Sequence, residues 1–174
     1  MSTDPFPDGS LDGIAARLVG SWRLVRWAMV HADAALGTTF PYGADADGLL
    51  VYTADGWMSG AIARANRPPF SIGTLRSAPE QERLDACSGY FHYASRYHLR
   101  QGPAGPQVVH EVLLALDPGT AGTAQVRDVA FGADGTLHLT ANERSARGPS
   151  QRHQRHPRQQ QLQWRRWAPG AGER

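Results

Sequence analysis

Apolar and polar residues alternate along many short segments of the chain, and aromatic or β-branched residues occupy many of the apolar positions. This period of two is typical of strands that bury one face. Gly, Pro and Asp separate the segments, and Asp-Gly at 55–56 and at 134–135 favours tight hairpins. The pattern predicts about eight strands, at residues 21–31, 48–53, 57–64, 95–100, 107–115, 125–131, 136–141 and 161–167.

Two other stretches have helical spacing. Ser10 is suited to cap a short helix whose apolar stripe is formed by Leu11, Ile14 and Leu18 and which ends at Gly20. A second helix is predicted between the third and fourth strands, where Ser77 and Glu80 have the spacing of a capping box. We expect its stripe to pack on the sheet or to cover one end of it; the stripe consists of Leu84, Cys87 and Phe91.

These elements predict a mainly β protein, an antiparallel barrel of about eight strands with one short helix before it and one inserted helix. A barrel is favoured over a sandwich because the first and last strands are both rich in aromatic residues, and neither resembles a protected edge. Residues 10–168 are predicted to form this one domain, between tails at 1–9 and 169–174. A basic segment at 143–160, rich in Arg, His, Gln and Pro, is expected to be a mobile insert.

The amino-acid composition excludes several types of reaction and binding site. The chain has 174 residues, and its 18 positive side chains are all Arg, so Schiff-base chemistry and a phosphate-binding P-loop lysine are excluded. The net charge of +2 does not favour nucleic acid as a partner. The Arg-rich insert fits either a solvated loop or a contact with phosphates or acidic partners. No metal-ligand or dinucleotide spacing is present, so we expect neither metal nor cofactor.

The location is predicted from what the sequence lacks. Cys87 is the only cysteine, which favours a reducing compartment. No apolar run approaches the length of about 18 residues that a membrane span requires, and residues 1–12 are acidic and Pro-rich rather than basic and then apolar. A cytoplasmic protein is therefore expected. The sequence leaves a homodimer open.

Several short motifs occur in a fixed order along the chain: Gly20-Ser21-Trp22-Arg23-Leu24-Val25, Pro41-Tyr42-Gly43, the block from Gly48 to Ser59, Arg67-Pro68-Pro69-Phe70, the stretch from Tyr93 to Tyr97, and Trp164-Arg165-Arg166. In these motifs the chain resembles the bacterial lipocalin-like domain family from about Leu18 to Trp167. The resemblance implies a small closed barrel that encloses an apolar or amphiphilic small molecule. It also implies that Arg166 packs on Trp22 and closes one end. The basic insert departs from the family pattern.

Strand parity predicts which side chains enter the interior of such a barrel. The residues expected to contact a ligand are Tyr52, Met58, Arg64, Tyr97, His110, Arg127 and Trp164. A few polar groups among apolar ones are typical of a small-molecule site. Alternatives remain for two of them: His110 fits a hydrogen-bonded core histidine as well as an acid or base, and Arg127 fits a position at the rim or in an ion pair.

Two functions follow from this interior. The first is a binding protein that holds a hydrophobic or amphiphilic metabolite. The alternative is a cofactor-free cyclase or isomerase of a secondary-metabolite pathway that uses the same cavity. In that enzyme His110 would be the catalytic acid or base, and Arg127 with Tyr52 or Tyr97 would stabilise developing negative charge.

Overall fold

The computed structural model describes residues 10–143 and 157–167. Their elements, in chain order, are α1 (Leu11–Leu18), β1 (Gly20–His31), β2 (Thr38–Thr39), β3 (Asp47–Tyr52), β4 (Trp57–Ala63), α2 (Glu80–Ser88), β5 (Tyr90–Gly102), β6 (Gly105–Ala115), the short 3-10 helix η1 (Pro118–Thr120), β7 (Ala124–Phe131), β8 (Leu137–Glu143) and β9 (Arg158–Arg166).

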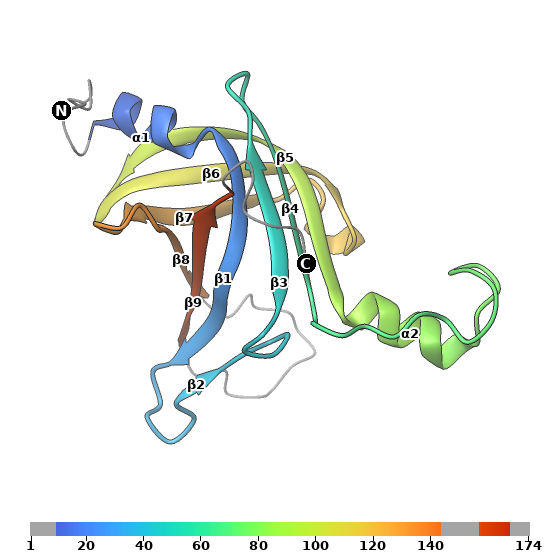
Figure 1. Cartoon of the computed structure of the whole chain (residues 1–174). Helices are drawn as coiled ribbons and strands as arrows, with labels where there is room; N and C mark the ends of the chain where they lie inside the picture. Colours follow the sequence, from blue (N-terminus) through green and yellow to red (C-terminus); the bar gives the residue numbers. More distant parts are fainter. Residues whose placement is uncertain (1–9, 144–156, 168–174) are drawn as a thin grey trace.

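Eight of the strands form a closed antiparallel barrel (Figure 1). From β3 to β9 each strand pairs with the next, and β1 pairs with both β3 and β9. The first and last strands of the barrel therefore join, as their aromatic-rich sequences predicted, with Trp22 opposite Arg166. The two-residue strand β2 pairs only with the far part of β1. The predicted all-β barrel is confirmed.

Local sequence explains how the barrel wall turns and bends. The two Asp-Gly hairpins form as predicted, because Gly56 and Gly135 adopt φ angles of 87° and 80°, which glycine tolerates best. The pairing of β1 with β9 shifts register between Leu24 and Arg26, at a β-bulge. This is where Arg26 interrupts the alternation of the sequence, and the bulge changes which later side chains of β1 face inward.

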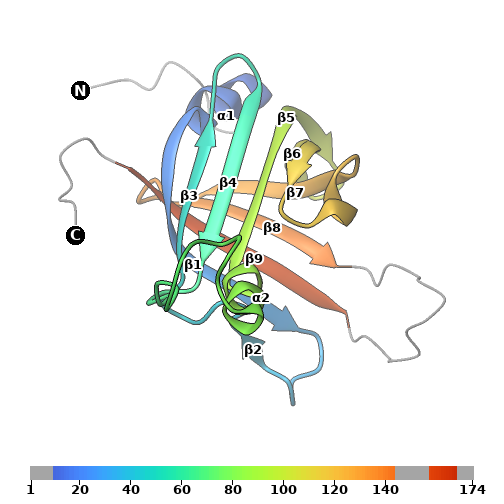
Figure 2. The ribbon, with the colours of Figure 1, turned by 90° about the vertical axis from the view of Figure 1, so that its right-hand side faces the viewer.

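Helix α1 covers one end of the barrel, and α2 lies toward the other end (Figure 2). The Ser10 hydroxyl accepts a hydrogen bond from the Gly13 backbone N–H at 3.1 Å, which caps α1 as expected. Ile14 and Leu18 are buried against the barrel core. The predicted helix before the strands is thereby confirmed.

The inserted helix forms between β4 and β5 as predicted, but the prediction that its apolar stripe packs on the sheet is wrong. No residue of α2 is buried, and the helix projects from the barrel (Figure 1). Phe91, which was expected on its stripe, belongs to β5 instead. The capping box also fails to form, because α2 begins at Glu80 with Pro79 at its N-cap, and the Ser77 hydroxyl accepts from the Thr74 backbone N–H at 3.0 Å instead. With Phe91 in the sheet, the helix lacks the third member of an apolar stripe.

Part of the predicted basic insert belongs to the sheet. Residues 158–160 pair with β8, so the last strand begins earlier than its alternation indicated. The rest of the predicted insert, residues 144–156, and the predicted tails at 1–9 and 169–174 lie outside the described residues. No helix in the described ranges is long and apolar enough to cross a membrane.

Candidate functional site

The interior of the barrel is largely filled by side chains, and a cavity of about 40 Å³ remains among them. This volume accommodates on the order of one to three water molecules. It is far below the 300–1,000 Å³ typical of sites for drug-sized ligands. Apolar side chains form most of the wall, and the polar groups that reach it come from Trp27, Tyr93, His110, Arg127, Gln160 and Trp164.

His110 lies at the centre of a buried hydrogen-bonded triad. It projects inward from β6 and is only 1% exposed. The Tyr52 hydroxyl lies 2.8 Å from its Nε2 atom, and the Tyr93 hydroxyl lies 2.7 Å from its Nδ1 atom. Both ring nitrogens are therefore engaged by tyrosines, one from β3 and one from β5.

Electrostatics keep this triad uncharged at neutral pH. Burial, and to a lesser extent the positive charge of Arg127, lower the pKa of His110 from 6.5 to about 3. Burial raises the pKa of both Tyr52 and Tyr93 above their usual value of 10.0, although Arg127 opposes the increase. A neutral imidazole and two neutral phenols are the result.

The neutral imidazole has one N–H donor and one acceptor, so the two tyrosines must have opposite roles. Tyr93 reaches the cavity, whereas Tyr52 does not line it. If Tyr52 donates to Nε2, then Nδ1–H donates to Tyr93, and the Tyr93 O–H remains available to a group in the cavity. The opposite tautomer would leave the Tyr52 O–H without an acceptor in a fully buried position, which costs about 1–3 kcal/mol. The geometry therefore favours the proton on Nδ1.

Two indole N–H groups also lack a partner. Among the described residues, Trp27 Nε1 and Trp164 Nε1 are buried and have no acceptor, and both side chains line the cavity. Buried polar groups nearly always have a hydrogen-bond partner, so each exception needs an explanation. The Ser95 hydroxyl is also buried without a partner, but it does not line this cavity.

Arg127 provides the positive charge of the interior. It projects from β7, lines the cavity and is half-buried. Its guanidinium donates to the Val126 carbonyl at 3.0 Å and to Gln125 Oε1 at 3.5 Å. No carboxylate of the described chain forms an ion pair with it. Of the two positions left open by the sequence, the structure places Arg127 at the lumen.

The other predicted ligand contacts are distributed over three environments. Met58 is buried and lines the cavity. Tyr97 is half-buried, donates from its hydroxyl to the Thr53 carbonyl at 2.8 Å and packs edge-on against Tyr52. Arg64 is exposed outside the lumen, over the ring of Tyr42. Its inward orientation was predicted by extending strand parity, but β4 ends at Ala63.

The end of the barrel near α1 is closed. The Arg166 guanidinium lies over the Trp22 ring, 4.2 Å from its centroid, and donates to the carbonyls of Val19 and Arg17. The Trp22 indole N–H donates to the Leu18 carbonyl at 2.8 Å. These contacts tie α1 to β1 and β9 at this end of the barrel.

The opposite end is covered by aromatic rings. Trp27 contacts Tyr42 edge-on, with ring centroids 4.9 Å apart, and Phe91 at 5.9 Å. Phe91 in turn contacts Tyr93 at 5.5 Å. We call Trp27, Tyr42 and Phe91 the aromatic cover. Only Tyr42 comes from a loop, which also contains Gly43 with a φ of 92°.

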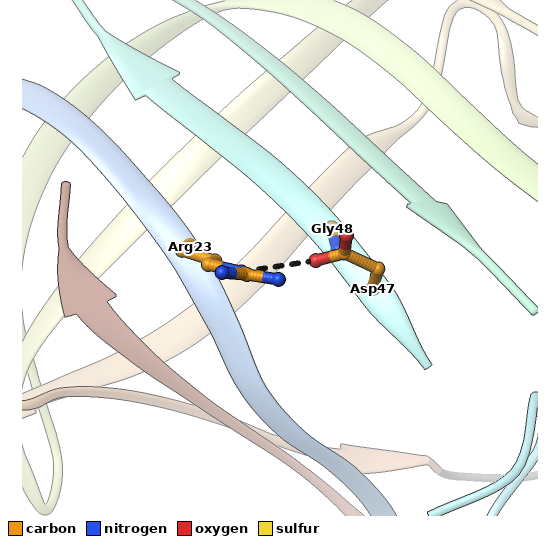
Figure 3. Close-up of polar contacts among 3 residues, drawn as sticks. All are labelled: Arg23, Asp47 and Gly48. Carbon is orange, nitrogen blue, oxygen red and sulfur yellow. Dashed lines mark hydrogen bonds and ion pairs between the residues drawn. The ribbon is translucent and has the colours of Figure 1, made fainter. Parts of the chain in front are cut away.

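A larger hollow lies outside the lumen, along the seam between β1 and β3. This open surface groove has a volume of about 910 Å³. Arg23 donates to Asp47 across it at 3.3 Å, and the Gly48 backbone N–H donates to the same carboxylate oxygen at 3.0 Å (Figure 3). Both charges are therefore paired, and both side chains are more than half exposed.

The groove and the internal cavity share no lining residue, and the barrel wall is closely packed at Gly48. A Cβ atom at that position would lie 3.1 Å from Leu24 Cβ and 3.2 Å from Ile62 Cγ1. Among the described residues, the buried indole N–H groups without an acceptor belong to Trp27 and Trp164, which line the lumen cavity. We therefore take the lumen, although it is much smaller, as the candidate site.

Comparison with known families agrees with this architecture. Residues 19–167 match the family model described as a lipocalin-like domain. The chain belongs to the lipocalin-like domain family. No curated protein matches the chain in sequence. The match spans every strand of the lipocalin-like barrel and both members of the Trp22–Arg166 pair, but it begins after α1.

Sequence reasoning missed Trp27, Phe91, Tyr93 and Gln160 as contributors to this lumen. Trp27 faces inward only because the bulge shifts β1 by one residue, which places it opposite the inward-facing Leu162. The break in alternation at Arg26 was the signal for that shift. Phe91 was missed because it was assigned to the helical stripe of α2.

Proposed function

We propose that this lipocalin-like barrel binds a small amphiphilic molecule in its lumen, with the polar end of the molecule at the internal cavity. The observation that carries the proposal is the pair of buried indole N–H groups, Trp27 Nε1 and Trp164 Nε1, which have no acceptor and belong to two residues that line one cavity. A buried donor that stays unbonded costs about 1–3 kcal/mol. A ligand that accepts these hydrogen bonds would recover that cost.

The two ends of the barrel suggest one route of entry. Arg166 and Trp22 fasten the end at α1 through hydrogen bonds and a cation–π contact. The aromatic cover has ring contacts instead, and its Tyr42 belongs to a loop. We therefore propose that a ligand enters past Tyr42.

The cavity must enlarge to hold more than a head group. Met58 is the most adaptable side chain of its wall, because an unbranched thioether changes rotamer at low cost. Movement of Tyr42 would extend the space toward the aromatic end of the barrel, and movement of Met58, which pairs with Tyr52 near the start of β1, would enlarge it on the side of α1. The apolar part of the ligand would occupy that extension.

Binding is favoured over proton-transfer catalysis by the state of His110. Each of its ring nitrogens already contacts a tyrosine hydroxyl, at 2.8 Å and 2.7 Å. A base at this position would have to give up one of these bonds before it accepted a proton. A pKa of about 3 also makes His110 a weak base.

Filling the cavity tests the proposal. Gly60 lines it, and an added Cβ would make ordinary contacts with Leu50 Cδ1 at 3.5 Å and Met58 Cε at 3.6 Å. We expect Gly60→Val to fold but to lose the small molecules that the wild-type barrel retains, as measured by native mass spectrometry and solvent extraction. Ala61→Val, on the outer face of the same strand, is the matched control and should retain them.

Equal retention by the Gly60→Val and wild-type barrels would contradict binding in the lumen. Circular dichroism of both variants ensures that a loss of ligand is not a loss of fold. Binding in the surface groove would leave Gly60→Val unaffected, because Gly60 is not part of that groove.

A further inference from the structure

The polar groups that line the lumen cavity are strongly biased toward donors. An indole N–H is a donor only, and a guanidinium has five donors and no acceptor. Trp27, Trp164 and Arg127 are thus donors by their chemistry. Tyr93 becomes a fourth donor because the Nδ1–H tautomer of His110 leaves its O–H available. Gln160 alone supplies an amide that offers both a donor and an acceptor.

The charged residues around the cavity also favour a ligand that accepts hydrogen bonds. No Asp or Glu is among the described residues that line the cavity. The charge of Arg127 acts on both Tyr93 and His110, so the polar part of the cavity is electropositive. Arg127 is half-buried and has no carboxylate partner among the described residues, so a ligand of opposite charge would find an unpaired guanidinium there.

Water satisfies such a cavity poorly. A water molecule that accepts from an indole N–H still has two hydrogens to donate, and the described side chains of the wall offer only the Gln160 carbonyl and the Tyr93 hydroxyl oxygen to receive them. A carboxylate accepts hydrogen bonds through about four lone-pair sites and donates none. It also forms paired, charge-assisted bonds with a guanidinium.

We infer that the lumen recognises a carboxylate, which pairs with Arg127 and accepts hydrogen bonds from the indole N–H groups of Trp27 and Trp164. This inference rests on the proposed function, because it names the head group of the molecule that the barrel binds. The tail of such a carboxylic acid would extend toward the aromatic cover. A primary amine is excluded from the same position by the charge of Arg127, and an alcohol leaves most of the donors unbonded.

Three probes of one length test the inference: hexanoate, 1-hexanol and n-hexylamine. The full chain labelled with ¹⁵N is titrated with each probe, and the five indole N–H signals are followed by NMR. Trp22 donates to Leu18, and Trp57 and Trp167 are exposed, so their signals are internal references. We expect hexanoate to shift the Trp27 and Trp164 signals and to bind at least about tenfold more tightly than 1-hexanol. We expect no shift of these two signals with n-hexylamine.

Substitution of the arginine identifies the counter-ion. Arg127→Gln should weaken hexanoate binding at least about tenfold and change 1-hexanol binding by less than about twofold. Arg165→Gln, an exposed arginine on β9 that borders the surface groove, makes the same charge change and should leave hexanoate binding unchanged. If Arg165→Gln weakens binding instead, the carboxylate binds in the groove and the inference is overturned.

The remaining outcomes separate the inference from the proposed function. Equal or tighter binding of 1-hexanol or n-hexylamine, with shifts of Trp27 and Trp164, would overturn carboxylate recognition but would support a ligand in the lumen. If no probe shifts these two signals while the reference signals move, then both the inference and the proposed function are wrong.

Discussion

Removing His110 provides the most direct test of the buried triad. Replacement by Leu puts an apolar side chain of similar size in its place and removes both hydrogen bonds to the tyrosines. Tyr52 is fully buried, and its hydroxyl has no other hydrogen-bond partner among the described residues. Loss of the hydrogen bond to His110 therefore costs about 1–3 kcal/mol at Tyr52 alone. The Tyr93 hydroxyl can turn toward the cavity and loses less. We expect His110→Leu to be less stable by roughly 2–4 kcal/mol at about pH 8.

The same variant should change how stability depends on pH. His110 has a pKa of about 3 in the folded protein against 6.5 as its ordinary value, so between these values the unfolded chain binds more protons. Stability from the neutral histidine is therefore fully present above pH 6.5 and is lost as the pH falls toward 3. One proton corresponds to about 1.4 kcal/mol per pH unit, which gives a loss of about 3 kcal/mol by about pH 4.5. The free energy of unfolding of His110→Leu should not show this decrease.

The free energy of unfolding, measured in urea from about pH 8 to about pH 4.5, compares the two proteins. The wild-type advantage at high pH should shrink to within about 1 kcal/mol at the acid end. The double variant Tyr52→Phe/His110→Leu should regain much of the stability lost in His110→Leu, because the fully buried Tyr52 hydroxyl is then no longer left unbonded. A constant difference across the pH range, or additive losses in the double variant, would refute the neutral, doubly bonded histidine.

Two further predictions concern the ends of the barrel. Gly20 has a φ of 135°, and a Cβ there would lie 2.3 Å from Arg166 Nη1, so Gly20→Ala should lower the free energy of unfolding by about 1–3 kcal/mol. Gly105→Ala has a similar φ of 141° but open space around it, and an equal loss in both variants would mean that displacement of Arg166 contributes nothing. At the other end, Tyr42→Ala should speed hexanoate association and dissociation several-fold in stopped-flow tryptophan fluorescence, whereas Phe40→Ala should not; unchanged rates in Tyr42→Ala would contradict entry past this residue.

The barrel was predictable because its determinants are local. Alternation along each strand specifies which face is buried, and the two Asp-Gly turns join neighbouring strands. The aromatic first and last strands carried the one long-range inference, that β1 meets β9. The packing of α2 was not predictable from its stripe. A stripe of three residues indicates a face only if all three lie in the helix, and Phe91 does not.

The site was predictable only as far as strand parity extends. Parity correctly placed His110, Arg127 and Trp164 at the lumen, since each lies inside a regular stretch of strand. It failed at Arg64, beyond the end of β4, and at Trp27, beyond the bulge of β1. The volume of the cavity has no counterpart in the pattern, because it depends on how side chains from opposite walls interdigitate.

The cavity is small, yet many of the residues in its wall are polar, which raises the question of what these polar residues contribute. Apolar residues of similar volume would fill the interior without leaving two indole N–H groups unbonded or a guanidinium without a counter-ion, and such replacements are often stabilising. The triad of Tyr52, His110 and Tyr93 differs, because its members bond to one another and it contributes to stability by itself. The unbonded donors have no such internal partner. An acceptor in the lumen would offset their cost to the folded barrel, so under the proposed function these donors serve ligand binding rather than folding.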